Sequence, residues 1–188
     1  VVTSIFPMYE IVKEIAGDAA EVSLMVGAND DAHHYEPSAQ AVANVNEADV
    51  FVYSSEVMEG WVDSLFSVVE NNDLHIVELG NGLNLEIDDS HIVDDHEHTD
   101  DDTHGHDHDH NHEGLDPHFW LDLTEVNKQL PLIVEALSKA DPKNTEIYEE
   151  NADMFSEQLL SLDQEYMTAF SQAKERILNP IETARDKI

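Results

Sequence analysis

Residues 48–79 have the sequence ADVFVYSSEVMEGWVDSLFSVVENNDLHIVEL, which predicts a strand, a helix and a second strand in succession. Residues 49–53 are almost entirely apolar, as expected of a strand that is covered on both faces. Residues 74–79 form the next short apolar run. The helix is predicted over residues 56–71, because apolar side chains recur there at helical spacing: Val57, Trp61, Leu65 and Val68. A helix between two buried strands is typical of a parallel sheet, since parallel neighbours need a long crossover connection.

The same alternation extends toward the N-terminus. Residues 1–5 and 21–26 predict two further strands. Between them, Pro7 opens a helical segment with apolar residues on one face, and Gly17 is its expected stop. After the second of these strands, Ser38 is placed to cap a short helix. Four strand–helix alternations of this length predict an α/β fold with a four-stranded parallel sheet flanked by helices.

The chain changes character after Gly82. Residues 85–114 are mostly acidic, His, Thr and Gly residues with little to bury, so we expect them to form a disordered insert within an α/β lobe made of residues 1–140. Thr124 is placed to cap the last helix of this lobe. Residues 141–178 then predict one long amphipathic helix, whose repeat covers roughly 30 residues or about 45 Å. A helix of this length often joins two lobes.

The composition is strongly acidic, because 8 Lys and Arg residues stand against 42 Asp and Glu residues, a formal net charge of −34 at pH 7. Such a surface repels phosphate backbones and anionic lipid headgroups, so we expect no nucleic-acid partner and no direct membrane binding. The acidity fits either adaptation to high salt or an ordinary secreted protein. The lack of Cys excludes disulfides, thiolate metal sites and Cys nucleophiles. Because a predicted strand begins at Val1, we expect a trimmed N-terminus.

The most conspicuous motif lies inside the insert, where five His residues occupy every second position: His104, His106, His108, His110 and His112. Neutral imidazole binds zinc, copper and nickel, and a flexible chain can fold two or three such rings onto one ion. We therefore expect an accessory loop that collects metal ions without much selectivity. The alternatives are a solvated acidic linker with incidental His residues, or an expression tag, although the run is internal and mixed with Asp.

Two further motifs contain His residues outside the insert. Residues 33–38, His-His-Tyr-Glu-Pro-Ser, follow the second strand, and ligands of open α/β sheets collect at the carboxyl ends of strands. The alternative is a polar turn with exposed imidazoles. Residues 116–122, Asp-Pro-His-Phe-Trp-Leu-Asp, place His118 in an apolar and aromatic segment. A lone His in such a segment is usually a core residue with satisfied hydrogen bonds.

These two motifs and the acidic His-rich insert between them resemble, in this order, the metal-binding subunits of bacterial zinc and manganese ABC importers. Residues 2–9, VTSIFPMY, and residues 48–53, ADVFVY, are similar to the same family. The resemblance implies two α/β lobes joined by one long helix, with the metal ion in the cleft between them. Residues 179–188 would then begin a second lobe that this sequence does not contain.

The resemblance implies His33 and His118 as the metal ligands of the first lobe, with His34 as a weaker candidate. The remaining ligands would come from the second lobe. Eight His residues between His91 and His112 favour Zn²⁺ over Mn²⁺, because zinc prefers nitrogen ligands and manganese accepts more carboxylate oxygens.

The implied function is an extracytoplasmic zinc receptor, periplasmic or lipid-anchored, that delivers Zn²⁺ to the membrane permease of an ABC importer. We expect a monomer that catalyses no reaction. The alternatives are a manganese-specific receptor, a cell-surface metal buffer or adhesin-like lipoprotein, and an enzyme with a catalytic zinc ion. The sequence contains no H-E-x-x-H motif and no phosphate-binding loop, which argues against the enzyme.

Overall fold

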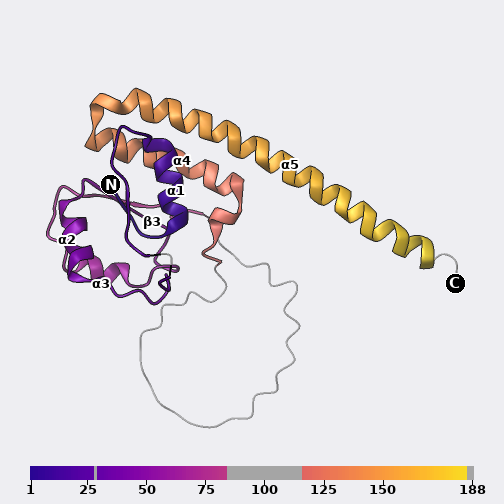
Figure 1. Cartoon of the computed structure of the whole chain (residues 1–188), viewed down its shortest axis with the longest axis horizontal. Coiled ribbons are helices and arrows are strands. Elements are labelled where there is room, and N and C mark those ends of the chain that lie inside the picture. Colours follow the sequence, from indigo (N-terminus) through magenta and orange to yellow (C-terminus); the bar gives the residue numbers. More distant parts are fainter. Residues whose placement is uncertain (28, 84–115, 186–188) are drawn as a thin grey trace, which may run out of the picture.

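The computed structural model describes residues 1–27, 29–83 and 116–185 and contains a four-stranded parallel sheet (Figure 1). Its strands are β1 (Val2–Thr3), β2 (Ser23–Leu24), β3 (Val50–Tyr53) and β4 (His75–Glu78), in the spatial order β2-β1-β3-β4. In the register of the sheet, Phe51 lies opposite Val2 on one side and Ile76 on the other. The predicted α/β class and the four parallel strands are therefore confirmed.

The two inner strands are buried on both faces and the edge strands are not. Every residue of β1 and β3 is buried, whereas Ile76 in β4 is 49% exposed. β1 and β2 are shorter than the predicted strands 1–5 and 21–26. The first strand ends early because the chain turns at Ile5 into helix α1 (Phe6–Ala16).

Helices cover both faces of the sheet (Figure 1). α1 and α4 (Leu123–Ala140) lie on one face, and α2 (Ala39–Glu47) and α3 (Val62–Phe66) lie on the other. Two predicted helix ends are confirmed. α1 ends at Gly17, whose φ of 55° suits a residue without a Cβ. Ser38 caps α2, because its hydroxyl oxygen accepts a hydrogen bond from a backbone N–H of the first turn at 3.2 Å.

The helix predicted over residues 56–71 is wrong in extent, because only Val62–Phe66 are α-helical. Ahead of α3, the Glu59 carboxylate accepts hydrogen bonds from the two backbone N–H groups that follow β3. Behind α3, Asn46 Oδ1 accepts hydrogen bonds from two further backbone N–H groups at 2.7 and 3.1 Å. Such bonds from side chains compete with the helical ladder, and apolar spacing does not reveal them.

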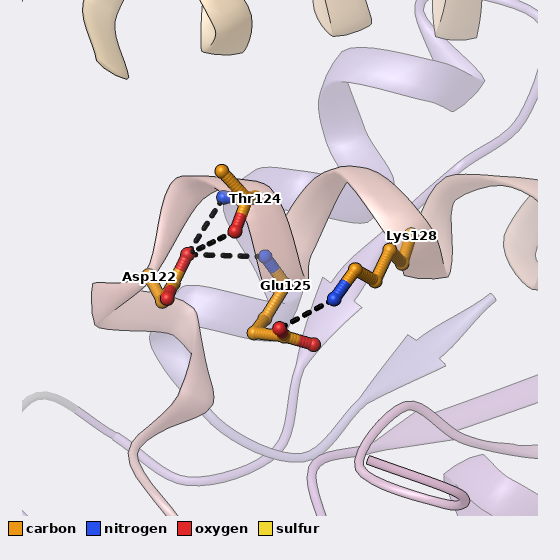
Figure 2. Close-up of polar contacts among 4 residues, drawn as sticks. All are labelled: Asp122, Thr124, Glu125 and Lys128. Carbon is orange, nitrogen blue, oxygen red and sulfur yellow. Dashed lines mark hydrogen bonds and ion pairs between the residues drawn. The ribbon is translucent and has the colours of Figure 1, made fainter. Parts of the chain in front are cut away.

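Asp122 caps α4, so the predicted cap at Thr124 is wrong (Figure 2). Asp122 Oδ1 accepts hydrogen bonds from Thr124 N at 2.8 Å, from Thr124 Oγ1 at 2.7 Å and from Glu125 N at 3.2 Å. The hydrogen bond from the Thr124 side chain is the main cause that lowers the pKa of Asp122. Thr124 lies inside the first turn of α4, so the position of the turn makes Asp122 the cap; its charged carboxylate is also favourable at the positive end of the helix dipole.

One long helix, α5 (Thr145–Arg185), follows a 3₁₀ turn over Pro142–Asn144. It begins later than the predicted helix 141–178, because Asp141 caps the short turn and not α5 itself, and it also ends later. Its 41 residues span about 62 Å, more than the predicted length. Figure 1 shows that its first half packs over α1 and α4 and that its second half extends beyond the sheet. Of the helices in the described ranges, none combines the length and apolar character of a membrane span.

Candidate metal site

The first candidate ligand, His33, lies in the loop between β2 and α2. Asp31 Oδ1 accepts a hydrogen bond from the His33 backbone N–H at 2.9 Å, and Asp31 Oδ2 lies 2.9 Å from His34 Nδ1. The bond to the His34 side chain, followed by the bond from the His33 backbone, lowers the pKa of Asp31. The loop therefore binds the His34 ring to Asp31, while the His33 ring lies against the second motif.

The second candidate ligand, His118, directly precedes a 3₁₀ turn (Phe119–Leu121) that leads into α4. Asp116 Oδ1 accepts a hydrogen bond from the His118 backbone N–H at 3.0 Å and lies 2.7 Å from His118 Nδ1. These two bonds, the backbone one first, lower the pKa of Asp116. An ionised carboxylate can only accept, so the proton of this bond is on Nδ1, and in a neutral ring Nε2 then has the free lone pair. Such a carboxylate partner is typical of His residues that bind metal ions.

The structure places the His33 and His118 rings side by side. Their centroids are 6.1 Å apart and their planes meet at 76°. Two imidazoles on one zinc ion, with bonds of about 2.0–2.1 Å at a tetrahedral angle, would have centroids about 5 Å apart. The observed pair is about 1 Å wider than that geometry, a gap that small side-chain rotations can close. Both residues are exposed, and the His118 side chain is 42% exposed.

Aromatic side chains pack behind both candidate ligands. The Trp120 ring lies 5.2 Å from the His118 ring. Trp61 Nε1 donates a hydrogen bond to Ala32 O at 2.8 Å, and the Trp61 ring lies 5.1 Å from the Tyr35 ring. His118 is thus supported by an aromatic neighbour but is not the enclosed core His that the alternative interpretation of its segment predicted.

A hollow of about 450 Å³ lies beside His118, between the segment that leads into α4 and the extended half of α5. Its lining combines carboxylates with apolar side chains: Asp116, Asp122, Glu125, Asp163, Leu121, Leu123, Phe119, Tyr166, Met167 and Phe170. Phe170 is 68% exposed. The carboxylates give this side of the site a negative potential, which favours a cation over an anion.

Two imidazoles, but no third ligand, converge in the part of the chain that the structure describes. Within residues 1–27, 29–83 and 116–185, no group of three or more His, Asp and Glu side chains is arranged to hold a metal ion. The predicted insert and its accessory ligands lie outside the described residues: His104, His106, His108, His110 and His112. Metal binding by these five residues stays a prediction.

Sequence reasoning missed three residues that contact the segments carrying the candidate ligands, and one buried carboxylate in the interior of the sheet layer. Asp31 and Asp116 each precede a His by two positions, and this repeated Asp-x-His spacing is a signal that could have found them. The apolar spacing assigned Trp61 to the buried face of a helix, although it also holds the His33 loop. Glu59 was missed because apolar spacing does not mark a buried carboxylate: two of its partners, Ser54 N and Ser55 N, lie within five residues, and only the Ser4 hydroxyl comes from far along the chain.

Three comparisons relate the chain to known proteins. The family model described as zinc-uptake complex component A, periplasmic (ZnuA), matches residues 1–180. The zinc-binding lipoprotein AdcA of Streptococcus pneumoniae is 37% identical over 176 residues, which cover 94% of this chain and 34% of that protein. The high-affinity zinc uptake system protein ZnuA of Bacillus subtilis is also 37% identical over 176 residues, which cover 94% of this chain and 53% of that protein.

A solved structure agrees with these sequence matches. The Zn(II)-bound ZnuA-like domain of S. pneumoniae AdcA superposes with a TM-score of 0.68 at 33% identity, covering 88% of this chain and 53% of that one. The chain spans about a third to a half of the length of the two curated relatives. Because the family model covers nearly the whole sequence, the chain belongs to the ZnuA family of periplasmic zinc-uptake components.

Proposed function

We propose that the chain is the first lobe of an extracytoplasmic receptor that binds Zn²⁺ and delivers it to the membrane permease of an ABC importer. The observation that carries this proposal is the approach of His33 and His118 to 6.1 Å between ring centroids, with a carboxylate on the Nδ1 of His118. Further support comes from the relatives, which are named for zinc binding and zinc uptake.

In the proposed site, His118 binds the ion through Nε2 while its Nδ1 stays bonded to Asp116, and His33 supplies the second nitrogen. Zinc takes four ligands in a tetrahedral arrangement. The other two positions would be filled by water or by groups of a second lobe, as the family architecture implies. An ion shared between two lobes is released when the lobes separate, which is what a delivery protein requires.

We further propose that the insert acts as an accessory zinc collector. Its imidazoles would raise the local zinc concentration near the site and pass ions to the pair His33 and His118. Nitrogen donors in both places favour zinc over manganese, which accepts more oxygen ligands. Because the insert is also rich in Asp, it attracts cations before any ring binds them.

The proposal includes a location outside the cytoplasm, periplasmic or lipid-anchored, and a monomer that works with a permease. The words lipoprotein and periplasmic in the descriptions of the relative and of the family support the location. The family is one of solute-binding receptors, so the ion is cargo and we propose no catalysed reaction at this site.

The test is a zinc titration of the full, metal-free chain followed by Trp fluorescence. The two Trp residues of the sequence, Trp61 and Trp120, both lie at the site, so the signal comes from there and not from the insert. Losing a residue that only hydrogen-bonds a metal ligand usually weakens metal binding about 10–100-fold. His33→Ala and His118→Ala should each weaken zinc binding by more than this, because each removes a ligand itself.

His34→Ala is the matched control for this test. His34 is adjacent to His33 in the sequence, but its ring is bonded to Asp31, so its removal should leave the zinc affinity unchanged. The proposed site is wrong if His33→Ala or His118→Ala binds zinc as tightly as the wild-type chain, or if His34→Ala weakens binding as strongly as they do.

A further inference from the structure

Glu59 is a carboxylate in the interior of the lobe that the proposed zinc site does not use. Its side chain is fully buried, at 0% exposure. Glu59 Oε2 accepts hydrogen bonds from Ser55 N at 2.9 Å and from Ser54 N at 3.1 Å, and Oε1 accepts one from the Ser4 hydroxyl. Ser4 follows β1 and the other two residues follow β3, so Glu59 joins the carboxyl ends of the two inner strands.

The residues bound to Glu59 are in turn joined to the two edge strands. Val26, which follows β2, donates its backbone N–H to Ser4 O at 2.9 Å. Gly80, which follows β4, donates its backbone N–H to Ser54 O at 2.7 Å. The carboxyl ends of all four strands are therefore linked, directly or through one further bond, to this one carboxylate.

A short path leads from Glu59 to the His33 loop. Trp61 lies two residues after Glu59, and its indole N–H bonds to Ala32 O at 2.8 Å. The same indole packs against Tyr35, with ring centroids 5.1 Å apart. Ala32 and Tyr35 flank His33 in the sequence, so Trp61 holds this loop on both sides of the candidate ligand.

A second path leads from Glu59 to His118. Gly80, bonded to Ser54, lies close to Phe119: an ideal Cβ on Gly80 would be 3.7 Å from Phe119 Cε1. Phe119 is only 5% exposed and directly follows His118. The buried Phe119 ring therefore anchors the segment that carries His118 against the end of β4.

We propose that Glu59 is a positioning residue for zinc: its buried carboxylate sets the placement of His33 relative to His118 without touching the ion. The inference rests on the proposed function of that pair. For stability alone, a buried charge is a poor choice, because well-packed apolar residues often serve a protein interior equally well. Here the carboxylate provides what an apolar residue cannot, namely acceptors for N–H and O–H groups that arrive from different strands.

The experiment uses the full chain and the Trp-monitored zinc titration. Glu59→Gln keeps the volume but replaces one acceptor oxygen by an NH2 group, which can only donate. Trp61→Phe removes the bond to Ala32 while keeping a ring, with Trp120 as the remaining reporter. Leu137→Ala is the control for lost stability. Leu137 is 2% exposed and lies near the end of α4 far from His118, about 20 Å along the helix.

Glu59→Gln and Trp61→Phe should each weaken zinc binding about 10–100-fold, the usual effect of losing an outer partner. In Glu59→Gln, the indole N–H resonance of Trp61 should also shift and its hydrogen should exchange faster. Leu137→Ala should unfold at lower urea concentration with unchanged zinc affinity. The positioning role is overturned if Glu59→Gln binds zinc like the wild-type chain, or if Leu137→Ala loses as much affinity.

A fallback variant and a parallel measurement complete the experiment. If Glu59→Gln does not fold, Ser4→Ala, which removes a single hydrogen bond, and Trp61→Phe decide the question by the same titration. His33→Ala and His118→Ala are measured in parallel. If they leave zinc binding intact, the proposed site fails; if they weaken it and the variants around Glu59 do not, only the positioning role fails.

Discussion

Replacing Gly80 with Ala should loosen the carboxyl edge of the sheet and weaken zinc binding. An ideal Cβ on Gly80 would lie 2.9 Å from Ser54 O, a separation that real Cβ atoms essentially never show. It would also lie 3.1 Å from Ser55 Cβ. Ser54 O already accepts the Gly80 N–H at 2.7 Å, so relief of the clash must stretch this bond or move the segment toward Phe119.

The expected loss of stability is about 2 kcal/mol, from three effects of known size. Forcing a methyl group into a packed region costs about 1–3 kcal/mol. Weakening the bond between Gly80 and Ser54 adds up to about 1 kcal/mol. Ala restricts the unfolded chain more than Gly does, which raises the free energy of unfolding by about 0.4–1 kcal/mol and offsets part of this loss. Any displacement of Phe119 should reach His118, its neighbour in the sequence, so zinc affinity should fall as well.

Urea denaturation of the metal-free chain measures the first effect, and the Trp-monitored zinc titration measures the second. The denaturation midpoint should fall while the slope stays constant. Gly60→Ala is the matched control, because a Cβ at Gly60 would meet nothing nearer than Glu56 O at 3.8 Å, so it should be neutral or slightly stabilising. Equal midpoints and equal zinc affinities for Gly80→Ala and Gly60→Ala would refute the reasoning.

Two further changes test the start of α4 and the insert. Asp122→Ala should destabilise the chain by about 1 kcal/mol, because it removes the acceptor that binds Thr124 and Glu125. The pKa of Asp122 is lowered, foremost by the Thr124 side chain. This stabilisation is therefore present above the ordinary Asp pKa of about 3.9 and is lost as pH falls through the lowered value. The urea midpoints of variant and wild type should differ at neutral pH and converge in acid, and a constant difference would contradict the assignment. Deleting residues 88–112 should reduce the number of zinc ions bound in equilibrium dialysis. It should change the free energy of unfolding by less than roughly 1 kcal/mol, because a segment poor in apolar residues has little to bury. Loss of the fold on deletion would show that the segment is structural.

The parallel sheet could be predicted because its signal is local and repeated. Short apolar runs separated by helical spacing define the order of strands and helices, whatever the rest of the chain does. Gly17 and Ser38 were predictable for the same reason, because each acts on backbone groups within a few residues of itself. The start of α4 shows the limit of this argument, since Asp122 and Thr124 are both good caps and only the geometry of the turn selects one.

The extent of α3 depended on contacts that the apolar spacing does not contain. Glu59 and Asn46 bind backbone N–H groups on either side of α3, and Asn46 belongs to α2. The bonds of Asn46, which join residues 24 and 25 positions apart, form only once the layers have packed, whereas those of Glu59 are local but do not depend on apolar spacing. Apolar spacing therefore predicted a helix over the whole of 56–71, of which the tertiary structure keeps a short central part.

The candidate site divides in the same way. The sequence by itself determined the residue types: two imidazoles in separate motifs, each preceded at two positions by Asp. The resemblance of these motifs indicated a zinc or manganese receptor, and the His residues of the insert favoured zinc. The tertiary structure alone decided that His33 and His118 lie side by side: Trp61 is hydrogen-bonded to the His33 loop, and Phe119 lies near the end of β4. Residue types are carried by the chain, whereas distances between motifs far apart in sequence are set only when the carboxyl ends of the strands come together.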